Sequence, residues 1–103
     1  MALNINATIT TDEGFEVTNA FGYLNIYILA PESNWANISY FKSKADYEAN
    51  QQPLNVSTLP SNVQTELTAA EFWGDALATT VHNKCIEKIE EVTGADTCTI
   101  DQD

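Results

Sequence analysis

Two side chains, His82 and Cys85, have the types and spacing that nucleophilic catalysis could use. Three positions apart on a helix, they would be neighbours on its surface. A cysteine nucleophile also needs an exposed thiol, an oriented base and donors for an oxyanion. Cys85 falls on the apolar stripe of the predicted helix, and no third group is evident. We therefore expect a buried thiol beside a surface histidine, and we assign no catalytic residue.

Metal-binding side chains are few and poorly spaced. One histidine and two distant cysteines cannot form a four-ligand zinc site alone. The acidic pairs Asp12–Glu13 and Asp101–Asp103 lack the glycine-punctuated spacing of a calcium loop. The glutamates in 87–91 would lie on a solvated helix flank. We assign no metal, no cofactor and no small-molecule substrate.

Cys85 and Cys98 are the only cysteines. Because we expect the chain to turn back after Gly94, a disulfide between them is possible. Without an export signal we favour free thiols.

The charge is strongly one-sided, with fifteen acidic residues, four lysines, no arginine and a net charge of −11. Phosphate backbones are bound chiefly through Lys and Arg, so the composition disfavours direct nucleic-acid binding. A solvated acidic surface is the favoured interpretation, and a match to a basic partner stays open. No apolar run approaches the ~20 residues of a membrane-spanning helix, so we expect no membrane partner.

The clearest helical pattern runs from Thr68 to Gly94. Thr68 and Glu71 have the spacing of a capping box, and Gly94 is suited to end the helix. We expect one long helix over 68–93 that buries an apolar stripe against a sheet, each large side chain contributing ~1.5–3 kcal/mol. The predicted stripe is Trp73, Leu77, Val81, Cys85, Ile89 and Val92.

Alternating or continuous apolar patterns predict strands elsewhere. We expect them at 3–9, 15–18, 21–30, 35–42, 53–60 and 96–100, with one helical turn in 43–52. The chain should form a single α+β domain over 1–103. A β-rich part (2–58), forming a small antiparallel sheet or partly open barrel, would pack against the C-terminal helix, and a short strand (96–100) would follow.

The strand at 21–30 carries large side chains on both faces, so it needs two covers. Leu24, Ile26 and Ile28 would face the helix. Aromatic residues on and near the other face would be either core or protein–protein interface, where Tyr and Trp are enriched. The interface candidates are Phe21, Tyr23, Tyr27, Trp35 and Tyr40.

The succession "GYLNIYILA", "ISYFKSKADYEANQQPLNV" and "AEFWGDALATTVHNKC" resembles small virion-associated structural proteins of tailed bacteriophages. The resemblance implies a non-enzymatic virion structural or assembly protein that acts in multiple copies. It would bind copies of itself or other virion proteins, and would reside in the virion after assembly in the host cytoplasm. Head, neck and tail locations stay open.

A second hypothesis uses the same aromatic residues differently. In a monomeric binding module for a host protein or a carbohydrate, these rings would line a groove.

Overall fold

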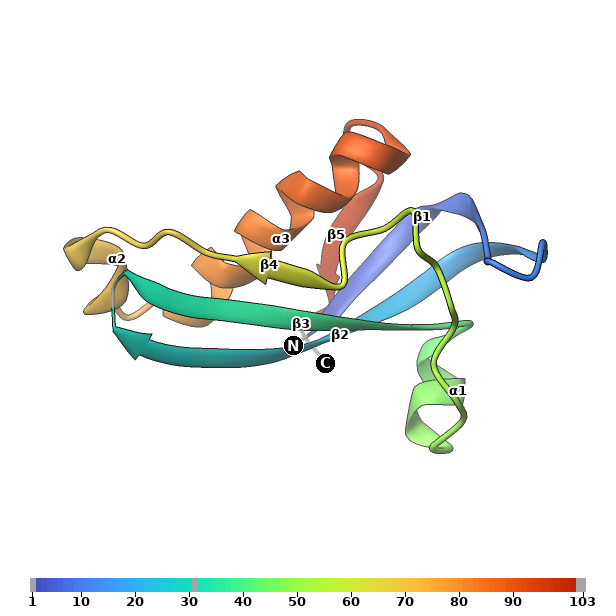
Figure 1. Cartoon of the computed structure of the whole chain (residues 1–103), viewed down its shortest axis with the longest axis horizontal. Helices are drawn as coiled ribbons and strands as arrows, with labels where there is room; N and C mark the ends of the chain where they lie inside the picture. Colours follow the sequence, from blue (N-terminus) through green and yellow to red (C-terminus); the bar gives the residue numbers. More distant parts are fainter. Residues whose placement is uncertain (1, 31, 102–103) are drawn as a thin grey trace.

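The computed structural model describes residues 2–30 and 32–101. Its elements are β1 (Ala2–Thr10), β2 (Glu16–Ala30), β3 (Ser33–Phe41), α1 (Lys44–Glu48), β4 (Asn62–Gln64), α2 (Ala69–Phe72), α3 (Leu77–Thr93) and β5 (Cys98–Asp101). The strands form one antiparallel sheet in the order β4-β3-β2-β1-β5. The predicted α+β class is confirmed, with an open sheet. Helix α3 lies over one face, here called the inner face, and α1 lies on the opposite, outer face (Figure 1).

The predicted strands at 15–18 and 21–30 are one continuous strand, β2. Where a corner was expected, Asn19 adopts a left-handed conformation with a φ of 61°, and the pairing with β1 shifts its register. Asparagine tolerates this conformation better than most residues. The irregularity lets Val17 and Ala20, three positions apart, both face the core.

The predicted strand at 53–60 is wrong. The proline at each end of that segment has no N–H that could donate to a neighbouring strand. The segment runs along the edge of β3 and is held there by isolated backbone hydrogen bonds. The Leu54 N–H donates to the Tyr40 carbonyl at 2.6 Å, and the Ile38 N–H donates to the Ser61 carbonyl at 2.8 Å. Regular pairing with β3 begins only after the second proline, in β4.

The single helix predicted over 68–93 is two helices. The capping box is formed as expected, with Thr68 and Glu71 exchanging bonds of 2.9 and 3.1 Å, but it caps only the short α2. Gly74 follows, and glycine is among the poorest helix formers. The chain packs so closely here that a Cβ at Gly74 would lie 2.8 Å from the Ala70 carbonyl oxygen.

The break also changes which residues face the sheet. Trp73, predicted to point inward, is 79% exposed, and Val92 at the other end of the stripe is 52% exposed. Helix α3 ends at Gly94, as predicted, where φ is 106°. The side chains that α3 buries are Val81, His82, Cys85 and Ile89.

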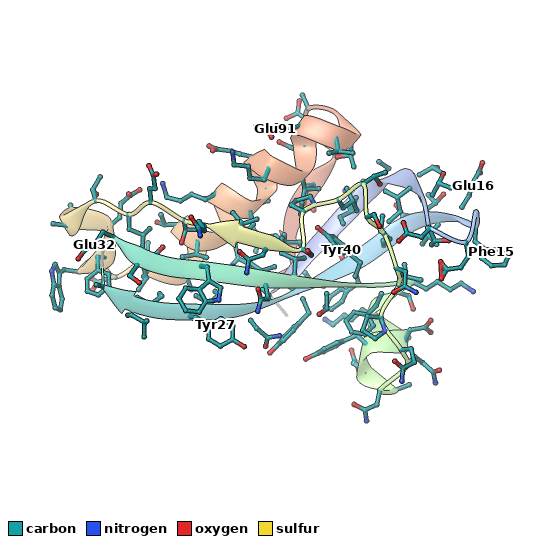
Figure 2. All side chains as sticks on the ribbon, viewed as in Figure 1. Phe15, Glu16, Tyr27, Glu32, Tyr40 and Glu91 are labelled. Atoms are coloured by element: carbon teal, nitrogen blue, oxygen red, sulfur yellow. The ribbon has the colours of Figure 1, made fainter. Side chains whose placement is uncertain are left out.

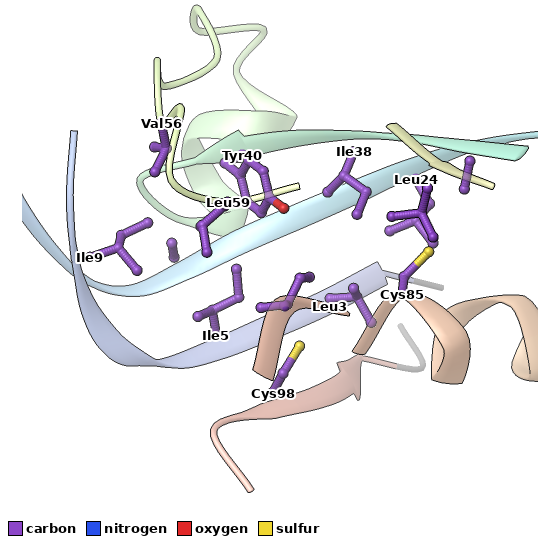
Figure 3. Packing of buried hydrophobic residues seen from close by; sticks show 14 of the residues in the cluster. Leu3, Ile5, Ile9, Leu24, Ile38, Tyr40, Val56, Leu59, Cys85 and Cys98 are labelled. Carbon is purple, nitrogen blue, oxygen red and sulfur yellow. The ribbon is translucent and has the colours of Figure 1, made fainter. Parts of the chain in front are cut away.

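The main core lies between α3 and the inner face (Figure 3). Its largest fully buried side chains come from β1 and α3, which are far apart in the sequence: Leu3, Ile5, Val81, Cys85 and Ile89. Strand β5, predicted at 96–100, adds Cys98 to this core, as expected from its alternation. Burial on this scale holds α3 on the sheet, because each large apolar side chain contributes ~1.5–3 kcal/mol.

Two matched side-chain truncations can test which face of α3 packs against the sheet. Ile89→Ala should lower the free energy of unfolding by about 2–5 kcal/mol, because it leaves a cavity in a closed core. Val92→Ala, one turn later on an exposed position, should change it by no more than about 0.5 kcal/mol. Urea denaturation measures both. An equal loss in the two variants would contradict the observed orientation of the helix.

Candidate protein interface

Helix α1 covers part of the outer face with a single aromatic ring. The Ser43 hydroxyl accepts the Asp46 N–H at 3.2 Å and so starts the helix. Tyr47 then lies over the strands, with ring centroids 5.3 Å from Phe21, 4.7 Å from Tyr23 and 5.2 Å from that of the neighbouring phenylalanine of β3. Phe21 is buried in this cluster and Tyr23 is half-buried, so the chain itself covers two of the predicted interface candidates.

Tyr40 is a third candidate that the chain covers, and its prediction as an interface residue is wrong. It pairs with Gly22 on the inner face, where Ile38 also lies, and it belongs to the main core. Its hydroxyl donates to the Pro60 carbonyl, which is a partner that a buried tyrosine needs. Burial raises the pKa of this phenol well above its usual value. Figure 3 shows the ring among core residues.

The other two candidates, Tyr27 and Trp35, remain on an open part of the outer face. They are direct cross-strand partners on β2 and β3, and their rings stack with centroids 5.3 Å apart. Tyr27 is 44% exposed (Figure 2) and Trp35 is partly exposed. The paired strands therefore place the two rings against each other, and the aromatic pair still faces outward.

Beside the aromatic pair, three asparagines form a row across three strands. Asn25 pairs with Asn37, and Asn37 pairs with Asn62 of β4. The Asn62 side-chain amide donates to the Asn37 carboxamide oxygen at 2.7 Å. The open patch is the name used below for these five side chains: Asn25, Tyr27, Trp35, Asn37 and Asn62.

The open patch contains no charged side chain, although the chain has a net charge of −11. Glu32 lies in the turn at the tip of the β2–β3 hairpin, at the rim of this surface (Figure 2). On the outer face of β5, Asp101 is paired with Lys44 of α1 at 3.6 Å. Two further ion pairs involve α3: Lys84–Glu71 at 3.7 Å and Lys88–Glu91 at 3.9 Å.

His82 and Cys85 do not form an accessible catalytic pair. The prediction that His82 lies at the surface is wrong: it is buried on α3 together with Val81 and Cys85, its neighbours on the helix. Its Nδ1 lies 2.7 Å from the Ala78 carbonyl oxygen, and this nitrogen must therefore carry the proton. Its Nε2 is buried and has no hydrogen-bond partner in the described part of the chain. A substrate cannot reach either nitrogen or the fully buried Cys85 thiol.

Burial also keeps both cysteines in the unreactive thiol form. Removal from water raises the pKa of Cys85 to about 11. The same effect, with the negative charge of Glu90 nearby, raises the pKa of Cys98 to about 12. Both cysteines are free. Because the thiolate is the nucleophile, these groups are suited to packing rather than to chemistry.

Ser57 and Asp12 form an exposed hydrogen-bonded contact that has a structural role. Ser57 donates to Asp12 through both its hydroxyl, at 2.6 Å, and its backbone N–H, at 2.9 Å. These bonds lower the pKa of the Asp12 carboxyl. Asn55 adds a bond of 3.1 Å to Glu13. Together they attach the segment after α1 to the β1–β2 turn.

Sequence reasoning missed several residues that shape this surface. Tyr47 lies in a segment interpreted only as polar with a helical turn, although Ser43 and Asp46 have capping spacing that could have placed the helix. The asparagine row could not be found from local sequence, since Asn62 meets Asn37 only through the pairing of β4. Across residues 2–30 and 32–101, no three metal-ligating side chains come together. Asp103, considered above as a calcium ligand, lies outside the described residues.

Comparisons of the chain with protein-family models, with curated proteins and with solved structures gave no significant match. Within the described residues, no helix combines the length and apolar character needed to cross a membrane.

The buried thiols should resist modification in the folded protein. At about pH 8, a disulfide reagent such as dithionitrobenzoate should leave Cys85 and Cys98 unmodified, because the reactive thiolate is scarce and covered. In denaturing urea both thiols should react. Absorbance of the released thiol follows the reaction. Rapid modification of the folded chain would contradict the burial of these groups.

The same raised pKa values predict alkaline destabilisation. Above the ordinary cysteine value of 9.0, the unfolded chain releases thiol protons that the folded chain retains up to about pH 11–12. The stabilisation is therefore complete below about pH 9 and is lost as the pH rises through this window. Urea midpoints measured across it should fall. A Cys98→Ala variant that folds should show a shallower decline, and an unchanged slope would contradict this assignment.

Proposed function

We propose that this chain is a non-enzymatic structural or assembly protein of a tailed-phage virion, present in multiple copies and acting by protein–protein association through the open patch. The observation that carries the proposal is an uncharged, aromatic surface left open on a strongly acidic chain. The cores of protein interfaces are depleted in charged residues and enriched in Tyr and Trp. The resemblance to small virion-associated proteins supplies the class of assembly.

The geometry favours association through a face rather than through strand edges. Strand β4, at one edge of the sheet, has three residues, and β5, at the other, has four. Short edge strands are a common protection against edge-to-edge pairing. The hairpin of β2 and β3 instead presents its outer face over several residues.

A monomeric module for a host protein or a carbohydrate is the second candidate. Exposed aromatic rings beside carboxamides favour it, because sugars stack on rings and bond to amides. A carbohydrate ligand is less favoured, because Tyr27 and Trp35 stack on one another and part of each ring face is already covered.

The proposal predicts a selective assembly defect. Tyr27→Ser should leave the fold intact, because it removes an exposed ring and an aromatic contact of only about 0.5–1.5 kcal/mol. It should greatly reduce the amount of this chain in particles purified from infected cells, measured by quantitative mass spectrometry.

Phe15→Ser provides the matched control. Phe15 is 70% exposed at the β1–β2 turn, at the opposite end of the molecule from Glu32 and far from the open patch (Figure 2). This variant should enter particles like the wild type. Absence of the wild-type chain from particles would contradict the virion proposal. Normal incorporation of the folded Tyr27→Ser variant would contradict the role of the patch.

A further inference from the structure

Strand β5 lies at one edge of the sheet, and one side of its backbone faces away from the other strands. In the described part of the chain, the strand that pairs with β5 is β1, and the pair is antiparallel. The Asn6 N–H continues this register and donates to the Thr97 carbonyl at 2.5 Å. Because hydrogen-bonded and non-hydrogen-bonded pairs alternate along an antiparallel ladder, the N–H and C=O groups of Cys98 and Ile100 point away from β1. A strand added to this edge would bond to these groups.

Glu90 of α3 already binds the first of them. The Cys98 N–H donates to Glu90 Oε2 at 3.2 Å. The carboxylate oxygen therefore lies where the carbonyl oxygen of an added strand would have to lie. The bond also agrees with the ladder pattern, because it shows independently that the Cys98 N–H faces the open edge and not β1.

The space beside β5 would otherwise accept a strand. A hollow of about 430 Å³ lies between α3 and β5, and its lining includes Ile86, Glu90 and Ile100. Side chains alternate between the two faces of a sheet, so an added strand would place every second side chain in this hollow. The two isoleucines would favour an apolar side chain there, and Glu90 is the acidic group that stands in its way.

We infer that Glu90 closes the β5 edge against the addition of a strand. An added strand must displace the carboxylate from the Cys98 N–H and replace a charge-assisted bond with a weaker bond between neutral groups. The displaced carboxylate, which is half-buried, would lose its acceptor contact. Covering or charging an exposed edge is a common way for sheets to avoid edge-to-edge pairing. This role goes beyond the proposed function and does not depend on the open patch.

Removal of the carboxylate tests the inference at the amide that it protects. In Glu90→Ala, the Cys98 amide should exchange with solvent deuterium at least about tenfold faster than in the wild type, because it loses a charged acceptor. Glu90→Gln keeps an oxygen acceptor and should exchange more slowly than Glu90→Ala. Glu87→Ala is the control, because it removes the same charge from an exposed position of α3. Amide-resolved exchange measured by NMR follows all four proteins.

A capped peptide of residues 2–9, ALNINATI, supplies the strand to be added, because this uncharged sequence already pairs with β5 as part of β1. At millimolar concentration it should slow exchange of the Ile100 amide in Glu90→Ala, but not in the wild type or Glu87→Ala. Ile100 reports the open edge, since a peptide that replaced β1 would bond to Thr99 instead. Equal protection of Ile100 in the wild type would overturn the inference. So would an Ile100 amide that the peptide leaves unprotected in Glu90→Ala, or Cys98 exchange that this substitution does not accelerate.

Discussion

The β2–β3 hairpin carries large side chains on both faces, while residues 2–30 and 32–101 include only one long helix to cover them. Helix α3 closes the inner face, with Val81, Cys85 and Ile89 in the main core. On the outer face, the five-residue α1 covers the part around Phe21 and leaves the part around Tyr27 open. The incomplete cover of the outer face leaves the candidate interface open.

Charge and exposure are distributed accordingly. Fifteen acidic residues oppose four lysines, yet the five positions of the open patch are aromatic or carboxamide. Exposed apolar side chains also occur elsewhere, at Phe15 and Trp73. These stand in a turn and at the end of a short helix, respectively. The open patch differs because paired strands fix the positions of its side chains relative to one another.

Local pattern was sufficient to predict much of this fold. Alternation placed the strands that became β1, β3 and β5, and it separated Leu24 and Ile26 from the outer face of β2. The capping box at Thr68 is formed as predicted, but the helix that it starts ends at Phe72. The length of this helix could not be predicted, because local signals do not show whether a helix continues through a glycine.

The errors arose where distant contacts decide the outcome. Prolines at both ends made 53–60 resemble an edge strand, whereas bonds to β3 hold it as an irregular segment. The sequence prediction places Tyr40 with the interface candidates. Tyr40 follows Ile38 by two residues on β3, so both side chains lie on the same face of the sheet, in the core. Of the candidate interface, only Tyr27 and Trp35 remain open, and the asparagine row depends on strand pairing that no local pattern encodes.

The most direct test of this account is hydroxyl-radical footprinting of Tyr27 and Trp35, in the isolated chain and in the particles that contain it. The account predicts that both rings are oxidised in the isolated chain and protected after assembly. Equal oxidation of both rings in the two states would contradict it, because the open patch would then remain uncovered in the protein's working form.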